Sequence, residues 1–350
     1  MMRLIGVAVV AGLMVGAGLQ AAQTADPDAL ASQARKLTIA GQLSESIALF
    51  GKALAIDPEL FAAHLGLGLA LDLEGRYEQA REHLTRAIAL AAENERGLAL
   101  GAMAASYAFE GRTADAGSYY EKQFDLQMAA GNRGAAAATA NAIGRVFLEG
   151  GRPDDAERWY RTGYETARKL TGLPDDQVDL WEMRWLHAQS RIAARRGRPD
   201  EAARHAEALK RLIDKGGENA KQMPIYHYLI GYNAFHAGKL DQAVAALQQA
   251  DQEDPFILGL LAQAYEKQGK ADAAREMWKK VLASTSHSLQ NAFFREKARA
   301  ALKSPSVVVA PAGGRIPRGH PAVVATPPPL PRAPHRRRLR RAGPPRRPRA

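Results

Sequence analysis

The sequence predicts an all-α fold, an α-solenoid of about seven helix pairs plus a C-terminal capping helix, followed by a disordered tail. Three observations predict it. A glycine recurs between helical patterns at spacings of 34, 36, 40, 46, 41 and 31 residues. A small residue stands five positions after each glycine. Hydrophobic residues make up 46% of the chain and aromatic residues only 7%, which favours closely packed helices over a β-sandwich.

The chain begins with the layout of a secretory signal peptide, which we assign to residues 1–22. A positively charged start precedes an apolar run over 4–19, and small residues follow at Ala21 and Ala22. We expect cleavage after one of these two alanines. The alternative is an uncleaved anchor through residues 4–22. Both readings place the body outside the cytoplasm, as a periplasmic or secreted protein.

The body, residues 27–303, is built from a unit of two helices joined at a glycine. Glycine adopts the left-handed backbone that ends a helix without steric cost. The small residue then lets the second helix approach the first, and a mostly larger residue four positions later fills the space between neighbouring pairs. The glycines are Gly41, Gly75, Gly111, Gly151, Gly197, Gly238 and Gly269. The small residues are Ser46, Ala80, Ala116, Ala156, Ala202, Ala243 and Ala274, and the filling residues are Phe50, Leu84, Tyr120, Tyr160, Ala206, Leu247 and Trp278.

The second unit, residues 61–94, contains Leu67, Gly68, Leu71, Gly75, Tyr77, Ala80, Leu84 and Ala87. This pattern resembles the tetratricopeptide repeat (TPR), and six further units over 27–303 resemble it to differing degrees. The fifth departs most, with Ser190 at the first-helix glycine position and Ala206 at the filling position. The resemblance implies a protein-interaction scaffold whose first helices line a concave groove.

Two stretches of extra sequence in the middle repeats, around 131–136 and 171–182, predict lengthened helices. Residues 171–174 interrupt one helix, and the acidic pair Asp175 and Asp176 starts the next, where the helix dipole favours negative charge. Residues 287–303 form a final amphipathic stretch, which we interpret as a solvating end helix.

We expect no enzymatic activity, catalytic residue, metal or cofactor. The chain has no cysteine, which excludes thiolate chemistry and Cys-ligated metals. It contains no nucleophile elbow, no phosphate-binding loop and no pair of histidines at the spacing that puts both on one helix face. The acidic cluster of Asp175, Asp176 and Asp179 is assigned to helix capping and solvation.

Groove-facing positions of the TPR family, carried onto this sequence by resemblance, give a map of the expected binding surface. The early groove is apolar, with Leu65, Leu69, Leu73 and Phe109. The middle and sixth repeats contribute the candidate partner-binding residues, which are Asn141, Arg145, Arg184, His187, Arg191, Arg195, Tyr228 and Tyr232. Arginine and tyrosine are the residue types that tend to dominate binding energy.

Our hypothesis is that an extended segment binds from the fourth to the sixth repeat, with an acidic side chain or free carboxylate near the arginines, since Arg engages a carboxylate through two parallel hydrogen bonds. The alternative is that Arg184, Arg191 and Arg195 form the solvated face of a long helix. For Tyr228 and Tyr232, packing against the next repeat is favoured over ligand contact.

Residues 304–350 hold 11 arginines, no Lys, Asp or Glu, and 12 of the 19 prolines, so we expect a disordered tail. The rest of the chain has 48 − 11 = 37 basic residues against 37 acidic ones. One reading of the tail is a tether to an anionic membrane or envelope surface, and another is a Pro-rich recognition ligand. A third is an out-of-frame or annotation artefact. Because export is expected, we do not expect a nucleic-acid partner.

Overall fold

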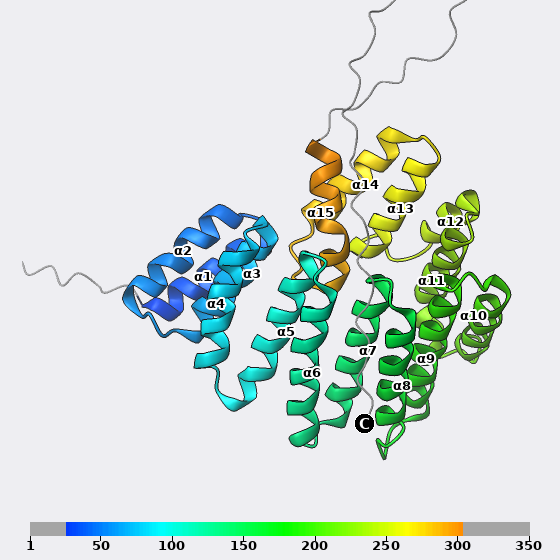
Figure 1. Cartoon of the computed structure of the whole chain (residues 1–350), viewed down its shortest axis with the longest axis horizontal. Helices are drawn as coiled ribbons and strands as arrows, with labels where there is room; N and C mark the ends of the chain where they lie inside the picture. Colours follow the sequence, from blue (N-terminus) through cyan, green and yellow to red (C-terminus); the bar gives the residue numbers. More distant parts are fainter. Residues whose placement is uncertain (1–25, 304–350) are drawn as a thin grey trace, which may run out of the picture. The chain divides into compact units, whose positions relative to one another are not determined.

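The computed structural model describes residues 26–303, so the signal peptide assigned to 1–22 and the tail at 304–350 lie outside the described residues. The described part contains fifteen α-helices, one 3₁₀ helix and no strand (Figure 1). The helices are α1 (Pro27–Ile39), α2 (Leu43–Ile56), α3 (Phe61–Glu74), α4 (Tyr77–Leu90), α5 (Glu93–Phe109), α6 (Thr113–Ala129), α7 (Arg133–Glu149), α8 (Pro153–Ala167), α9 (Asp175–Arg195), α10 (Pro199–Ile213), η1 (Asn219–Gln222), α11 (Met223–His236), α12 (Leu240–Leu247), α13 (Pro255–Lys267), α14 (Ala271–Ala283) and α15 (Leu289–Lys303).

The predicted seven helix pairs are confirmed, from α1 with α2 to α13 with α14. All seven predicted glycines lie at the turn inside a pair, and their φ angles fall between 69° for Gly197 and 94° for Gly75. This is the left-handed region, where an L side chain would be strained. The recurring glycines in the sequence therefore mark the turn of every helix pair.

The two side-chain positions that follow each glycine are buried as predicted. The seven small residues are at most 2% exposed, and the filling residues are at most 9% exposed. The filling residues need space on the first helix. A Cβ atom at Gly68 would lie 2.7 Å from Leu84, and one at Gly144 would lie 2.8 Å from Tyr160. The first-helix glycine therefore makes room for the filling residue of its own repeat, so Leu84 and Tyr160 fill space inside a pair, where the sequence predicts contact between neighbouring pairs.

The middle of the array has long helices, as expected from its extra sequence. α9 has 21 residues, and it begins with Asp175 and Asp176 in its first turn after the break at 171–174. The short η1 between α10 and α11 was not predicted. It places Asn219 so that its amide donates to Asp179 at 2.7 Å. Asp179 also accepts from Lys215 at 2.7 Å, so this carboxylate ties the start of α9 to the end of the α10 region.

The first helices of successive pairs contact one another, α1 with α3, α3 with α5, α9 with α11 and α11 with α13. We call the side that they form the inner face. The predicted end helix α15 is present, but it does more than cover the last pair. It packs on α14 and α13 and also contacts α5 and α7, so it lies across the inner face between distant repeats (Figure 1).

Burial of both sides of α15 explains this position. Leu289 and Ala292 belong to the hydrophobic core around Phe109, whereas Phe294 and Ala298 belong to the core around Phe256. An amphipathic helix with two apolar edges buries more surface between two repeats than at the open end of the array. We call residues 284–303, which comprise α15 and the segment before it, the clasp. Within residues 26–303, no helix is both long enough and apolar enough to cross a membrane.

Candidate functional site

The eight candidate partner-binding residues lie on three successive inner-face helices. α7 carries two of them, α9 four and α11 two. Spacings of three or four residues put the members of each helix on one side of it. They are Asn141 and Arg145, then Arg184, His187, Arg191 and Arg195, then Tyr228 and Tyr232. The structure therefore brings residues up to 91 positions apart, the separation of Asn141 and Tyr232, onto one region of the inner face.

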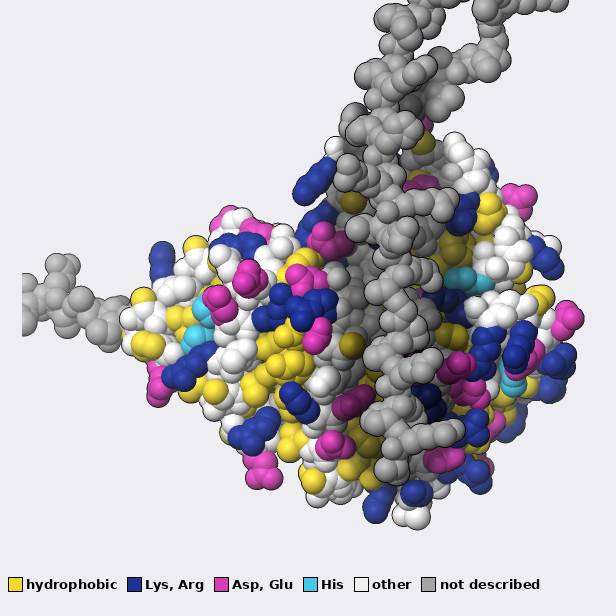
Figure 2. All heavy atoms as spheres, in the orientation of Figure 1, with side chains coloured by type: hydrophobic (Ala, Val, Ile, Leu, Met, Phe, Trp, Pro, Cys, Tyr) yellow, Lys and Arg dark blue, Asp and Glu magenta, His cyan; other side chains and the backbone are white. Residues whose placement is uncertain are grey.

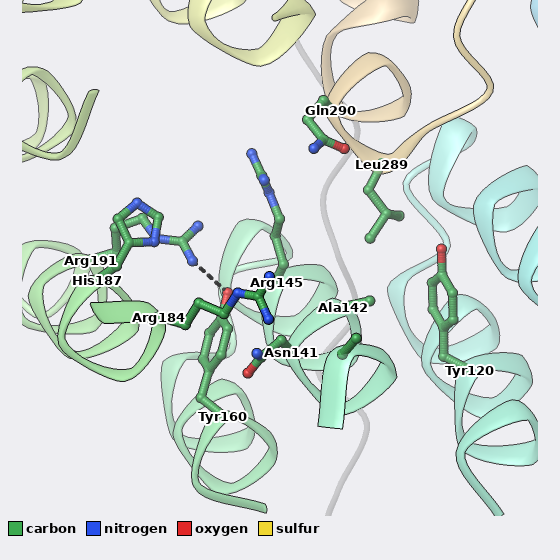
Figure 3. A pocket seen from close by; sticks show the side chains of 11 residues that line it. Tyr120, Asn141, Ala142, Arg145, Tyr160, Arg184, His187, Arg191, Leu289 and Gln290 are labelled. Carbon is green, nitrogen blue, oxygen red and sulfur yellow. Dashed lines mark hydrogen bonds between the residues drawn. The ribbon is translucent and has the colours of Figure 1, made fainter. Parts of the chain in front are cut away.

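Two neighbouring cavities are found in this region. The first has a volume of about 440 Å³ and lies between α7, α8 and α9, with the start of α15 opposite (Figure 3). Its lining includes Asn141, Arg145, Tyr160, Arg184, His187, Arg191, Leu289 and Gln290. The second, of about 360 Å³, shares Arg145, Arg184 and His187 with the first. Its remaining lining is mostly apolar and includes Leu180, Met183, Leu209, Ile225 and Tyr228, together with Asp254.

Arg191 is the most buried charge in the region, with 3% of the residue exposed. Its Nη2 donates to the hydroxyl of Tyr160 at 2.7 Å, and its Nη1 lies 3.9 Å from a carboxylate oxygen of Glu149. Its Nε and Nη1 have no hydrogen-bond partner within the protein. A buried guanidinium with free N–H groups is costly unless an acceptor is supplied.

Three neighbours of Arg191 also have a buried polar atom without a hydrogen-bond partner. Buried atoms without a hydrogen-bond partner are Nε of Arg145, Nε2 of His187 and the hydroxyl of Tyr228. Burial first, and then the charges of Arg191 and Arg145, lower the pKa of His187 well below its ordinary value of 6.5, so this imidazole is neutral at pH 7. The guanidinium of Arg145 lies 4.5 Å from the centre of the Phe256 ring. Residues that line the cavities therefore carry buried hydrogen-bonding atoms that other protein groups leave unused.

Arg195 and Tyr232 have a different environment. Arg195 Nη1 lies 3.1 Å from Glu149 Oε2, and the Tyr232 hydroxyl donates to Glu149 Oε1 at 3.3 Å. Tyr232 is fully buried and neither residue lines the two cavities. Tyr228 packs edge-on against Phe256 of the next repeat at a centroid distance of 5.9 Å. The packing favoured for the tyrosine pair is thus present, with Tyr228 also reaching the second cavity.

The alternative is that three arginines of α9 form a solvated face, but only one of them is solvent-exposed. Arg184 is exposed and lies over the ring of Trp181 at 4.4 Å. Arg191 and Arg195 instead have side-chain exposures of 4% and 21% and both lie beside Glu149. A direct role of any of the eight residues in binding stays a prediction.

The expected apolar early groove is divided by the clasp. Leu65 and Leu69 line an open cavity of about 530 Å³, where Ile39 and Leu98 are exposed. Phe109, by contrast, is 2% exposed and lies 5.2 Å from the ring of His287 in the clasp. The inner face is therefore not a continuous groove along the array.

Sequence reasoning missed two groups that shape the site. Tyr160 was assigned only as a filling residue, yet its hydroxyl accepts from Arg191. The clasp residues Leu289 and Gln290 border the first cavity, although they follow Arg145 by more than 140 positions. The one signal available in the sequence for a contact of the clasp was Asp72, a charged residue inside the apolar run of α3.

Charge on the described surface is mixed rather than one-signed. Figure 2 shows basic and acidic side chains interspersed with apolar ones over the visible part of the array. This agrees with the balance of 37 basic and 37 acidic residues outside the tail. The two cavities differ from this mixed surface, because their linings hold Arg145, Arg184 and Arg191 against one acidic residue, Asp254.

Comparison with known proteins identifies the repeat. Three tetratricopeptide repeat models match residues 95–169, residues 37–104 together with 234–290, and residues 187–256. No curated protein matches the chain.

Two solved structures illustrate the similarity. A tetratricopeptide repeat protein from Parabacteroides merdae ATCC 43184 is 17% identical with a TM-score of 0.49, over 79% of this chain and 97% of that one. The pilF protein of Pseudomonas aeruginosa is 16% identical with a TM-score of 0.41, over 64% of this chain and 89% of that one. On the family models, the chain belongs to the tetratricopeptide repeat family, whose repeats generally act as protein-interaction scaffolds.

Proposed function

We propose that this chain is a non-enzymatic scaffold that binds an extended peptide or partner helix on the inner face from the fourth to the sixth repeat. An acidic side chain or a free carboxylate of the partner binds at the two cavities, against Arg145, Arg184 and Arg191. The observation that carries the proposal is the set of buried nitrogen and oxygen atoms around these cavities that have no hydrogen-bond partner.

The energetics of buried polar groups support an anionic ligand. A buried donor without an acceptor costs roughly 1–3 kcal/mol, and hydrogen bonds to charged groups are the stronger ones. A carboxylate accepts through two oxygens and offers no donor, so it matches the free Nε and Nη1 of Arg191 and the free Nε of Arg145. A cationic partner would meet Arg145, Arg184 and Arg191, which outnumber the one acidic residue in the two linings, Asp254.

The second cavity supports a partner with an apolar group near its acid. Met183 and Leu209 are at most 4% exposed, and together with Ile225 they form an apolar wall beside the shared arginines. An apolar side chain placed there is removed from water at about 25 cal/mol for each Å² buried. Acid and apolar contacts together give the site both orientation and affinity.

We further propose that this binding takes place outside the cytoplasm, on the support of the leader-like sequence of residues 1–22. A tethering role for the basic residues 304–350 is an additional proposal that rests on their composition alone. The two roles are separable, because the candidate cavities are lined only by residues between 120 and 290.

Binding of a defined peptide tests the proposal. The probe is a fluorescent, capped peptide with a Glu-Asp-Glu centre beside a leucine, compared with its Gln-Asn-Gln counterpart by fluorescence anisotropy. We expect the acidic peptide to bind at least tenfold more tightly, with an affinity that falls as salt is added. Arg184→Glu is the variant of choice because Arg184 is exposed, whereas changes at buried Arg191 would damage the fold.

The matched control is Arg204→Glu, an exposed arginine on α10 that lines neither cavity. Both variants make the same change of charge. Because only Arg184 lines the cavities, Arg184→Glu should weaken peptide binding about tenfold more than Arg204→Glu does. Equal binding of both peptides, or equal losses in both variants, would refute the assignment of the site.

A further inference from the structure

A pair of histidines in the second repeat faces each other across the two helices of that repeat. His64 lies on α3 and His83 on α4, and their Nδ1 atoms are 3.0 Å apart. Their ring centroids are 5.2 Å apart. Both residues are half-buried, so each ring is held by packing and still open to solvent on one side. The pair is separate from the arginine-lined cavities and carries no part of the proposed function.

The backbone fixes which nitrogen of His64 carries a proton. Its Nε2 lies 3.0 Å from the carbonyl oxygen of Pro58. A carbonyl oxygen only accepts, so Nε2 is the protonated nitrogen and donates this bond. In the neutral ring, Nδ1 of His64 therefore carries the lone pair, and it accepts a hydrogen bond from Nδ1–H of His83.

The same arrangement is typical of a histidine that binds a metal. Metal-ligating histidines usually donate their second ring N–H to a carbonyl or carboxylate, which fixes the tautomer and the ring orientation. His64 has this second contact already, through Pro58. Nδ1 of His83 becomes a second ligand when its proton moves to Nε2, so that metal binding requires no net loss of a proton from the pair.

The distance between the two nitrogens allows both to bind one metal ion. With metal–nitrogen bonds of about 2.0–2.1 Å, two neighbouring ligands of a square plane lie about 2.9 Å apart, and two ligands of a tetrahedron about 3.4 Å apart. The observed 3.0 Å is the length of the hydrogen bond between the two rings, and it places both nitrogens within reach of one metal ion. Square-planar or tetragonal nitrogen sites favour Cu(II) or Ni(II), and Cu(II) binds more tightly in the general order of divalent metals.

We propose that His64 and His83 form a Cu(II)-binding site through their two Nδ1 atoms. Water molecules supply the remaining ligands, because within residues 26–303 no group of three or more His, Cys, Asp or Glu side chains is placed to hold a metal ion. The site is rigid, since α3 and α4 are packed against each other as one repeat.

Titration of the full chain, made without a histidine tag, with Cu(II) tests the site. We expect one Cu(II) per chain. Its electron paramagnetic resonance spectrum should show superhyperfine splitting from two imidazole nitrogens. His64→Gln and His83→Gln should each weaken binding at least tenfold, whereas His205→Gln, a matched change on the half-buried His205 of α10, should leave it unchanged. An equimolar amount of Zn(II) should not displace the copper.

A measurement on the unmodified sequence guards against variants that fail to fold. Labelling the histidine rings with ¹⁵N should change the nitrogen splitting pattern of bound Cu(II), because the nuclear spin of the ligand changes. A spectrum unaffected by the label, copper binding that survives both His→Gln changes, or displacement by Zn(II) would overturn the proposal and leave the pair as a hydrogen bond only.

Discussion

The ring of His287 in the clasp lies 2.8 Å from the buried carboxylate of Asp72 in α3, although 215 residues separate them in the sequence. A carboxylate only accepts, so His287 Nε2 donates this bond. The other carboxylate oxygen accepts from the hydroxyl of Ser106 on α5 at 2.8 Å. Asp72 is fully buried, and these contacts bind the end of the array to its second and third repeats.

Replacing His287 with alanine should destabilise the fold without altering the helix pairs. The change leaves one oxygen of a fully buried carboxylate without a donor, which costs roughly 1–3 kcal/mol. Urea unfolding followed by circular dichroism measures the loss. The control His205→Ala, at a half-buried site on α10, should change stability by less than half as much. A stability equal to that of the wild type would show that the clasp contact contributes nothing.

Arg295 should hold the clasp in place through the backbone. Its Nε donates to the carbonyl of Leu73 at 2.9 Å, and its Nη1 donates to the carbonyl of Ser284 at 2.8 Å. Arg295→Leu removes both bonds, so we expect α15 to separate from α3 and α5 and the radius of gyration in solution X-ray scattering to rise. Arg295→Lys keeps a charge but not the planar set of donors, and we expect a partial effect. An unchanged scattering curve for Arg295→Leu would contradict this role.

Two glycines of α7 should respond to alanine in opposite directions. Gly144→Ala places a methyl group 2.8 Å from the ring of Tyr160, and overpacking of this kind costs about 1–3 kcal/mol. Gly134→Ala meets open space and should stabilise the helix by roughly 0.5–1 kcal/mol. Thermal unfolding of the two variants compares them directly, and the same sign for both would count against the packing described for this repeat.

Acidification should destabilise the protein through two histidines whose pKa values are lowered in the fold. Burial, followed by Arg191 and Arg145, lowers the pKa of His187 well below 6.5, and burial with Arg195 and Lys267 lowers the pKa of His236 to about 4. Below pH 6.5 these histidines bind a proton in the unfolded chain but not in the folded chain. The free energy of unfolding therefore falls as the pH falls, until the pH reaches the folded-state pKa. Each fully shielded histidine contributes at most about 1.4 kcal/mol per pH unit, and the half-exposed His236 less.

Urea unfolding between pH 7 and pH 4.5 measures that slope. His187→Gln and His236→Gln should each show a shallower decline than the wild type, since the variant has lost a group that binds a proton only when unfolded. Identical slopes in all three proteins would mean that these imidazoles are as accessible to protons in the fold as out of it.

The repeat architecture could be predicted from the sequence because each of its determinants is local. Gly75 ends one helix, Ala80 and Leu84 pack against it from the next, and all three lie within ten positions. The placement of Asn141, Arg145, Arg184 and His187 around one cavity followed from the same regularity, since equivalent positions of stacked repeats face the same side.

The clasp and the histidine pair could not be predicted, because both depend on contacts that helical periodicity does not encode. The apolar pattern of residues 287–303 suits an end helix equally well on either side of the last repeat. Its position on the inner face is fixed by Asp72, Leu73 and Phe109, far away in the sequence. His64 and His83 are 19 positions apart on different helices, so a search for histidines on a single helix face misses them.

The central claim is that partner binding resides in the cavities between α7, α9 and α11 rather than in the tail. Its most direct test is capture of binding proteins from an envelope extract, read by mass spectrometry, with three baits in parallel. These are residues 23–350, residues 23–303, and residues 23–350 with Arg184→Glu. We expect one protein to be captured by the first two baits and lost with the third. A protein captured only when residues 304–350 are present would contradict the account and assign binding to the tail.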